Sequence, residues 1–271
     1  MIIHNAASEI PRSERIINTN GAAIHLTESS VAEPALIFLH YWGGSSRTLQ
    51  GVVDRLGETR RVIVLDQRSW GSSVATDGRY DLVTMADDVE AVAHTFGLKH
   101  YALVGHSMGG KVAQIVAARR PTGLLGLVLI APAPPTPMPV PEEQRAAMLG
   151  SYGSREGVLQ ALSVLAGSPL SPELRERVIE DTLRGAAGAK RAWTENGMIK
   201  DISAGFDAVT VPVTVIIGDR DQVEHEAALR EIFARLLPHT TFRVLNGVGH
   251  LSPLEAPDAV AEACSTFLDR L

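Results

Sequence analysis

The sequence has a single cysteine, few aromatic residues and no apolar run near the roughly 20 residues needed to span a bilayer. One cysteine, Cys264, excludes an internal disulfide framework and any multi-cysteine metal site, and its helical spacing predicts a small buried side chain. The N-terminal residues lack a basic stretch followed by an apolar stretch, so no signal peptide is expected. These absences together predict a soluble cytoplasmic protein without membrane contact.

Positive charge is also scarce, since 25 Lys and Arg stand against 31 Asp and Glu, for a formal net charge of −6. An acidic chain with scattered basic residues lacks the electrostatic footprint of a nucleic-acid-binding protein. No cluster of side chains resembles a metal site. With 271 residues, 45% of them hydrophobic, the chain is long enough to bury a sheet beneath helices on both faces.

Short apolar runs rich in β-branched residues alternate with longer amphipathic segments. Continuous apolar runs predict strands buried on both faces, and their alternation with helices predicts a mostly parallel α/β sheet. Before these runs, Asn20 and Gly21 predict a hairpin turn and therefore an antiparallel edge. We expect strands at residues 35–39, 61–65, 100–104, 124–130, 213–217 and 241–245, and helices at 48–57, 82–96, 108–119, 224–237 and 257–270.

The alternation stops at residues 131–141, where repeated prolines exclude a helix or an interior strand and predict a stiff, extended linker. Residues 142–205 then show helical patterning without strand runs, and Ser171 before Pro172 predicts a helix start. We therefore expect a core domain made of residues 1–131 and 206–271, with residues 132–205 inserted as a helical cap.

A serine stands in the G-x-S-x-G pattern of residues 105–109, between a predicted strand and a predicted helix. In that setting the pattern predicts a tight, strained turn that exposes the hydroxyl of Ser107. The serine would also lie at a helix N-terminus, where free amides favour developing negative charge. Ser107 is therefore the candidate nucleophile.

A candidate base and a candidate acid follow the last two predicted strands. His250 comes after the final strand, at the sheet edge where ligands bind in open α/β sheets. Asp219 and Asp221 both follow the penultimate strand, and either carboxylate could reach His250. Asp66, at the end of an earlier strand, is a weaker rival. The order Ser, Asp, His along the chain fits a triad.

From Ala35 onward the chain resembles the α/β-hydrolase superfamily, in the cap-bearing branch that includes esterases, haloperoxidases (perhydrolases), lactonases and carbon–carbon bond hydrolases. The resemblance rests on residues 40–44, 66–73, 105–109, 218–221 and 249–250. It implies the α/β-hydrolase fold and a hydrolase activity that needs no cofactor. In the family the acid usually stands three residues after the strand-end glycine, which selects Asp221.

The resemblance also implies an oxyanion hole made by the backbone amides of Trp42 and Met108, with His40 bracing the loop. Two positions depart from the family pattern, because Tyr41 and Ser69 stand where glycine is usual. The family's glycine at the position of Tyr41 often has an unusual φ. Tyr41 is therefore expected to shift the loop or to bring a phenol into the pocket.

The expected pocket is largely apolar, with Tyr41, Trp70, His106 and Trp193 as candidate lining residues. The sequence therefore predicts a serine hydrolase that cleaves a hydrophobic ester or lactone of small to medium size through an acyl-enzyme. A perhydrolase or carbon–carbon hydrolase would use the same triad, and sequence motifs do not rank these activities. A non-catalytic ligand receptor on this fold would not need an intact triad.

Overall fold

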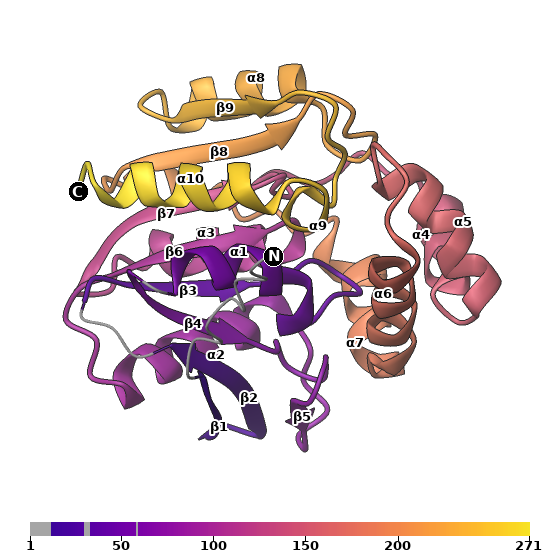
Figure 1. Cartoon of the computed structure of the whole chain (residues 1–271), viewed down its shortest axis with the longest axis horizontal. Helices are drawn as coiled ribbons and strands as arrows, with labels where there is room; N and C mark the ends of the chain where they lie inside the picture. The colour runs from indigo at the N-terminus through magenta and orange to yellow at the C-terminus, as the bar shows by residue number, and fades with distance from the viewer. Residues whose placement is uncertain (1–11, 30–32, 58) are drawn as a thin grey trace, which may run out of the picture.

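The computed structural model describes residues 12–29, 33–57 and 59–271, and among them nine strands form a single twisted sheet (Figure 1). The strand order is β1-β2-β4-β3-β6-β7-β8-β9, with β5 paired to β2. The strands are β1 (Arg12–Thr19), β2 (Ala22–Ser29), β3 (Ala35–Leu39), β4 (Arg61–Leu65), β5 (Val74–Ala75), β6 (Tyr101–His106), β7 (Leu124–Ile130), β8 (Val213–Gly218) and β9 (Thr241–Leu245).

The sheet is parallel along the order β4-β3-β6-β7-β8-β9, and it is antiparallel at its other edge, where β2 pairs with β1, β4 and β5. The hairpin turn between β1 and β2 contains Gly21 at φ 79°, a left-handed conformation that glycine adopts without strain. Both the predicted parallel sheet and the predicted antiparallel edge are therefore confirmed.

Helices cover both faces of the sheet (Figure 1). Alternate residues of β3 explain the continuous apolar runs, because Ile37 packs in the core cluster with α2 and α3 whereas Phe38 packs in the cluster with α1 and α10. The helices are α1 (Gln50–Leu56), α2 (Leu82–Thr95), α3 (Met108–Ala118), α4 (Glu142–Ser151), α5 (Arg155–Leu165), α6 (Pro172–Arg184), α7 (Ala187–Ala192), α8 (Glu226–Leu236), α9 (Ser252–Glu255) and α10 (Pro257–Leu268), with the 3-10 turns η1 (Ser46–Leu49) and η3 (Phe206–Ala208) and the π-helical turn η2 (Trp193–Gly197).

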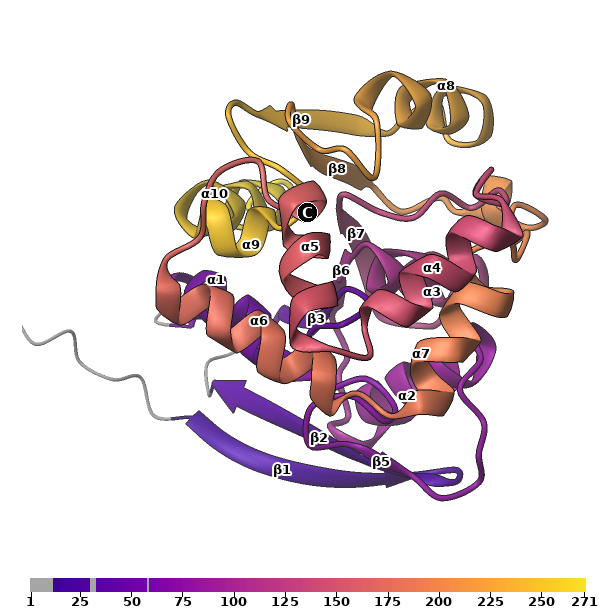
Figure 2. The same cartoon turned by 90° about the vertical axis from the view of Figure 1, so that its right-hand side faces the viewer.

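Four helices, α4 to α7, separate β7 from β8 in the chain. Figures 1 and 2 show them gathered beyond the carboxyl end of the sheet. As predicted, Ser171 caps α6, since its side chain accepts a hydrogen bond from the amide of Leu174 and Pro172 is the first helical residue. This helical segment thus lies at the same edge as the loops that follow the parallel strands.

The proline-rich residues 131–141 form neither helix nor strand, as expected, but they are not a free linker. The carbonyl of Ala133 accepts a hydrogen bond from the side chain of Gln114, and the carbonyl of Pro135 accepts one from the amide of Ile202. Residues 131–135 are buried. The segment is packed because its carbonyls, which proline leaves intact, find donors on α3 and on the returning chain.

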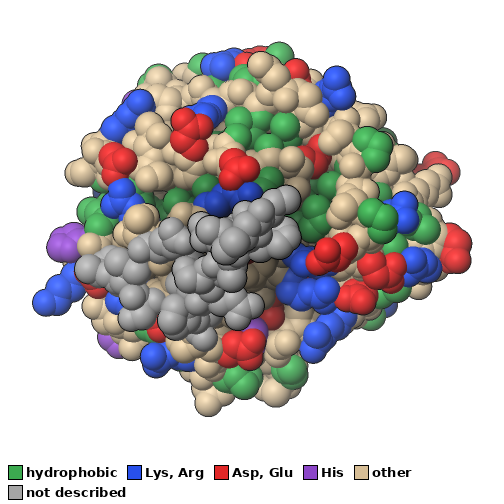
Figure 3. Space-filling model, in the orientation of Figure 1, with side chains coloured by type: hydrophobic (Ala, Val, Ile, Leu, Met, Phe, Trp, Pro, Cys, Tyr) green, Lys and Arg blue, Asp and Glu red, His purple; other side chains and the backbone are tan. Residues whose placement is uncertain are grey.

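The face shown in Figure 3 carries acidic and basic side chains interspersed with one another. Within the described ranges, every helix is too short or too polar to cross a membrane. Cys264, predicted to be a small buried side chain, is a residue of α10 whose side chain packs in the core with no exposed surface.

Candidate active site

Ser107 lies at the sharp turn between β6 and α3, at φ 52° and ψ −113°. A positive φ is rare for a residue with a side chain, so the turn is strained, as the sequence pattern predicts. A Cβ on Gly105 would lie 2.5 Å from the carbonyl oxygen of Gly109, and a Cβ on Gly109 would lie 2.6 Å from the carbonyl oxygens of Leu39 and His40. Both glycines are therefore required by close backbone packing.

His250 and Asp221 meet at the carboxyl edge of the sheet, from the loops after β9 and β8. The Nδ1 atom of His250 lies 2.9 Å from Oδ2 of Asp221, and both residues are buried. Oδ1 of Asp221 accepts the amides of Val223 and Glu224 at 2.8 and 3.0 Å. Burial alone would raise the pKa of Asp221, but His250 and these two amides hold it below its ordinary value. An ionised Asp221 requires the proton on Nδ1 of His250, which leaves Nε2 as an acceptor.

The two rival acids have other partners. Asp219 accepts the amide of Gly247 at 2.6 Å and so closes the turn before His250. The carboxylate of Asp66 accepts a hydrogen bond from Nδ1 of His25 at 2.9 Å and others from the backbone amides of Ser46 and Ser72. The structure therefore brings only Asp221 of the three against His250.

The hydroxyl of Ser107 makes no hydrogen bond to His250 within the described part of the chain. The two residues are linked through His106, whose Nε2 donates to the carbonyl of His250 at 2.8 Å. The rings of His106 and His250 lie 5.4 Å apart between centroids. The residue before the serine thus fixes the backbone that carries the candidate base.

His106 is fully buried, which lowers its pKa to about 3. In the unfolded chain the imidazole takes up a proton near pH 6.5, whereas in the folded chain it does so only near pH 3. His106 therefore does not lower the free energy of unfolding above pH 6.5, but it lowers it progressively as the pH falls from 6.5 towards 3. We expect His106→Gln, which keeps a donor, to reduce the loss of unfolding free energy between pH 7.5 and 5 by about 2 kcal/mol. Urea titrations of both proteins at the two pH values measure this difference, and equal losses would refute it.

The backbone amides of Trp42 and Met108, the candidate oxyanion donors, make no hydrogen bond to any other described residue. The peptide group that joins Tyr41 to Trp42 is held through the carbonyl oxygen of Tyr41. This oxygen accepts a hydrogen bond from Nδ1 of His40 at 2.7 Å and another from the amide of Gly44 at 3.1 Å. Nε2 of His40 in turn accepts the amide of Gln67. His40 therefore braces this loop.

The two departures from glycine have different outcomes. Tyr41 is absent from the residues with positive φ, so the tyrosine does not strain the loop. Ser69 does adopt a positive φ, 61°, and its hydroxyl accepts the amide of Ala75. A serine therefore occupies a glycine-like conformation there, with its side chain partnered.

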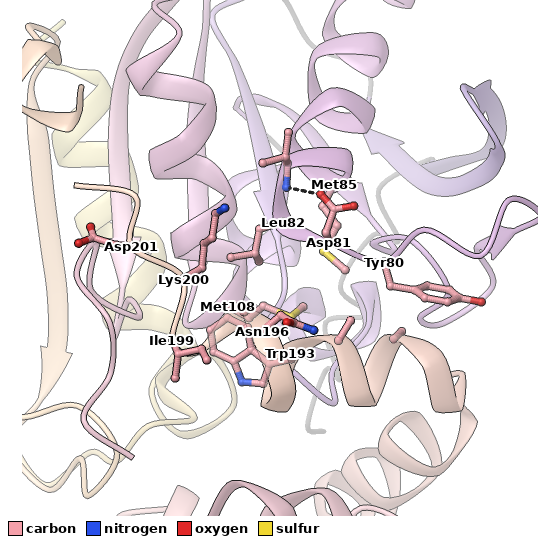
Figure 4. A pocket seen from close by; sticks show the side chains of 14 residues that line it. Tyr80, Asp81, Leu82, Met85, Met108, Trp193, Asn196, Ile199, Lys200 and Asp201 are labelled. Atoms are coloured by element: carbon pink, nitrogen blue, oxygen red, sulfur yellow. Dashed lines mark hydrogen bonds between the residues drawn. The ribbon is translucent and has the colours of Figure 1, made fainter. Parts of the chain in front are cut away.

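A cavity of about 690 Å³ lies between α2, the start of α3 and the α7–η2 segment. Its buried wall includes Met85, Met108, Ala189 and Trp193, and Figure 4 shows Met108 and Trp193 in its middle, between Tyr80 and Asp201. Met108 links the cavity to the Ser107 turn.

Of the four predicted pocket residues, Trp193 lines this cavity, whereas Tyr41, Trp70 and His106 do not. These three are at most 2% exposed. Tyr41 packs against the inserted helices and His106, and the ring of Trp70 lies so close to Gly185 that a Cβ there would overlap it. Their aromatic surface serves tertiary packing, which sequence spacing does not distinguish from a pocket wall.

Two buried ionisable groups near the site were not anticipated from the sequence. Lys111, one turn after Ser107, has its pKa lowered to about 8 by burial, and its ammonium group donates to the carbonyls of Thr136 and Met198. Burial raises the pKa of Glu224 well above its ordinary value. In the ranges that the structure describes, no group of three or more His, Cys, Asp or Glu side chains is placed to hold a metal ion.

Comparison with known proteins gives consistent matches over nearly the whole chain. A family model described as the alpha/beta hydrolase family matches residues 36–263. The chain is 26% identical over 246 residues to 2-(acetamidomethylene)succinate hydrolase of Mesorhizobium japonicum, which covers 87% of this chain and 88% of that protein. It is 24% identical over 250 residues to 3-oxoadipate enol-lactonase 2 of Acinetobacter baylyi, which covers 91% and 92%.

Among solved structures, carboxylesterase CesB from Bacillus subtilis superposes on this chain with a TM-score of 0.85. The superposition covers 97% of this chain and 93% of that one, at 21% sequence identity. At that identity, the likeness shows a shared fold.

Proposed function

The chain belongs to the alpha/beta hydrolase family and is a hydrolase, and from this premise we propose that it is a serine hydrolase. The proposed substrate is a hydrophobic carboxylic ester or lactone of small to medium size. The observation that carries the proposal is the buried hydrogen bond between His250 and Asp221, at the same sheet edge as the strained turn of Ser107.

In the proposed first step, Nε2 of His250 takes the hydroxyl proton of Ser107 as its oxygen attacks the acyl carbonyl. Asp221 keeps the proton of Nδ1 directed towards itself and stabilises the imidazolium that forms. His250 then protonates the leaving alcohol, and an acyl group remains on Ser107. Water repeats the sequence, with His250 as its base, and releases the acid.

The hydroxyl of Ser107 must come within hydrogen-bonding distance of Nε2 for this step. Such bonds are often long in a free enzyme and tighten when substrate binds. The two free amides of Trp42 and Met108 would then receive the oxyanion, each contributing on the order of 3 kcal/mol to the transition state. Because only backbone is used, both side chains remain available for packing or for substrate contact.

The buried part of the cavity beside Met108 is apolar and supports a hydrophobic substrate group, whereas its rim carries polar residues such as Asp81 and Lys200. Its inner wall carries the side chains of Met85, Met108 and Trp193, and its volume of about 690 Å³ is in the range of small-molecule sites. Residues 132–205 would act as the cap, since α7 and η2 supply one side of this cavity.

Labelling with a fluorophosphonate probe, followed by peptide mass spectrometry, tests the proposed nucleophile. We expect the adduct on Ser107, no labelling of Ser107→Ala, and strongly slowed labelling of His250→Ala. His25→Ala is the matched control, because His25 also donates to a carboxylate at 2.9 Å but on Asp66. An unlabelled wild-type protein that also shows no burst with p-nitrophenyl acetate would refute the proposal in favour of a non-catalytic receptor.

A further inference from the structure

The loop after β3, residues 40–45, is held from outside by the inserted helices. The hydroxyl of Tyr152 donates to the carbonyl of Trp42 at 3.4 Å, and the two rings stack with centroids 3.8 Å apart. Thr182 of α6 donates to the carbonyl of Gly43 at 3.0 Å, and the hydroxyl of Ser45 donates to the buried carboxylate of Asp181 at 2.7 Å. Three side chains of the inserted segment thus contact Trp42, Gly43 and Ser45 of this loop.

The close packing between the loop and the inserted segment depends on residues of both. Gly43 has φ 97°, and a Cβ there would lie 2.7 Å from the ring of Tyr152 and 3.1 Å from the hydroxyl oxygen of Thr182. The ammonium group of Lys190, which is buried, donates to the carbonyls of Tyr152 and Leu183 and so fixes Tyr152 to the end of α6. The contact is therefore a close-packed and specific interface.

The two ends of the loop are held by residues outside the inserted segment, and the amide of Ser45 donates to the hydroxyl of Thr48. His40 and the amide of Gly44 bind the carbonyl of Tyr41, at the opposite end of the peptide unit from the Trp42 amide. The next two carbonyls, those of Trp42 and Gly43, are bound by Tyr152 and Thr182. The orientation of the Trp42 amide is therefore set jointly by the core and by the inserted helices.

We infer that Tyr152 and Thr182 are positioning residues for the oxyanion hole, so that the helical segment takes part in transition-state binding as well as covering the cavity. The inference rests on the proposed function. Neither side chain touches the reacting atoms, since each acts through the backbone of residues 42–43. Losing one contact displaces the Trp42 amide without removing it, so the reaction slows while ground-state binding is retained.

The variant Thr182→Val tests this inference with p-nitrophenyl butyrate as substrate and an alkyl trifluoromethyl ketone as inhibitor. We expect kcat to fall about tenfold and the ketone to bind about tenfold more weakly, with KM within about twofold of wild type. Thr182→Ser, which keeps the hydroxyl, should restore both values.

Thr194→Val is the matched control, because the hydroxyl of Thr194 is also buried in the inserted segment but donates only to the carbonyl of Arg191. Tyr152→Phe removes one hydroxyl and keeps the stacking on Trp42, so it supplies an independent variant if Thr182→Val does not fold. An increase in KM alone, or a normal affinity for the ketone in both variants, overturns the inference. A wild-type protein that fluorophosphonate does not label would instead refute the proposed function itself.

Discussion

Asp221→Asn is expected to lower kcat/KM for an activated ester by about 10⁴-fold, with little change in fold or stability. The reason lies in the second oxygen of the carboxylate, which accepts the amides of Val223 and Glu224. In the variant, the side-chain oxygen of the asparagine must accept these two backbone amides, so its NH₂ group faces Nδ1 of His250. The imidazole then carries its proton on Nε2, where it is unable to accept the proton of Ser107.

Asp219→Asn is the control for this measurement. Asp219 stands two residues earlier on the same loop and accepts the amide of Gly247, an interaction that an asparagine oxygen can also make. We expect its kcat/KM to remain within about threefold of wild type. Steady-state kinetics and the rate of fluorophosphonate labelling should agree in both variants, and equal losses from the two would contradict the role proposed for Asp221.

Gly109→Ala is expected to lower the free energy of unfolding by about 3 kcal/mol or more and to abolish activity. The added methyl group would lie 2.6 Å from two backbone carbonyl oxygens, on Leu39 and His40, so no side-chain rotation relieves the overlap. Separation of α3 from the end of β3 would move the amide of Met108 away from that of Trp42. Urea unfolding and ester hydrolysis measure the two effects.

Gly150→Ala is the matched substitution. Gly150 lies in α4 with no atom within 4 Å of an added Cβ, and its φ is not positive. Alanine there should raise the free energy of unfolding by about 0.5 kcal/mol, because glycine loses more backbone entropy on forming a helix. A similar stability for both variants would show that the turn adjusts to a side chain at position 109.

Strand positions were predictable because burial on both faces imposes an unbroken apolar run. The strands at residues 35–39, 61–65 and 124–130 have the predicted bounds, and so does the edge strand at 241–245, of which only Leu245 is buried. The turn at Ser107 was also predictable, since its glycines are needed locally and leave a mark in the sequence.

Contacts between distant segments leave no comparable mark. His106 and His250 are 144 residues apart, and the hydrogen bond between them reflects only how the loops after β6 and β9 meet. The same holds for Thr182 and Gly43, 139 residues apart. His106 and Tyr41 were predicted to line the pocket, whereas in the structure both are buried and neither lines the cavity beside Met108.

The local pattern of apolar runs, glycines and prolines was sufficient to establish the parallel sheet, its antiparallel edge and the turn that presents Ser107, because each depends on neighbouring residues. The choice of Asp221 over Asp219 as the partner of His250 had already been favoured by the family resemblance, and the folded chain shows the contact itself. The cavity beside Met108 and the hydrogen bonds from α6 to the loop after β3 depended on the folded chain. These features arise where separate loops converge at one edge of the sheet, and the distances across that edge follow from packing of the whole domain.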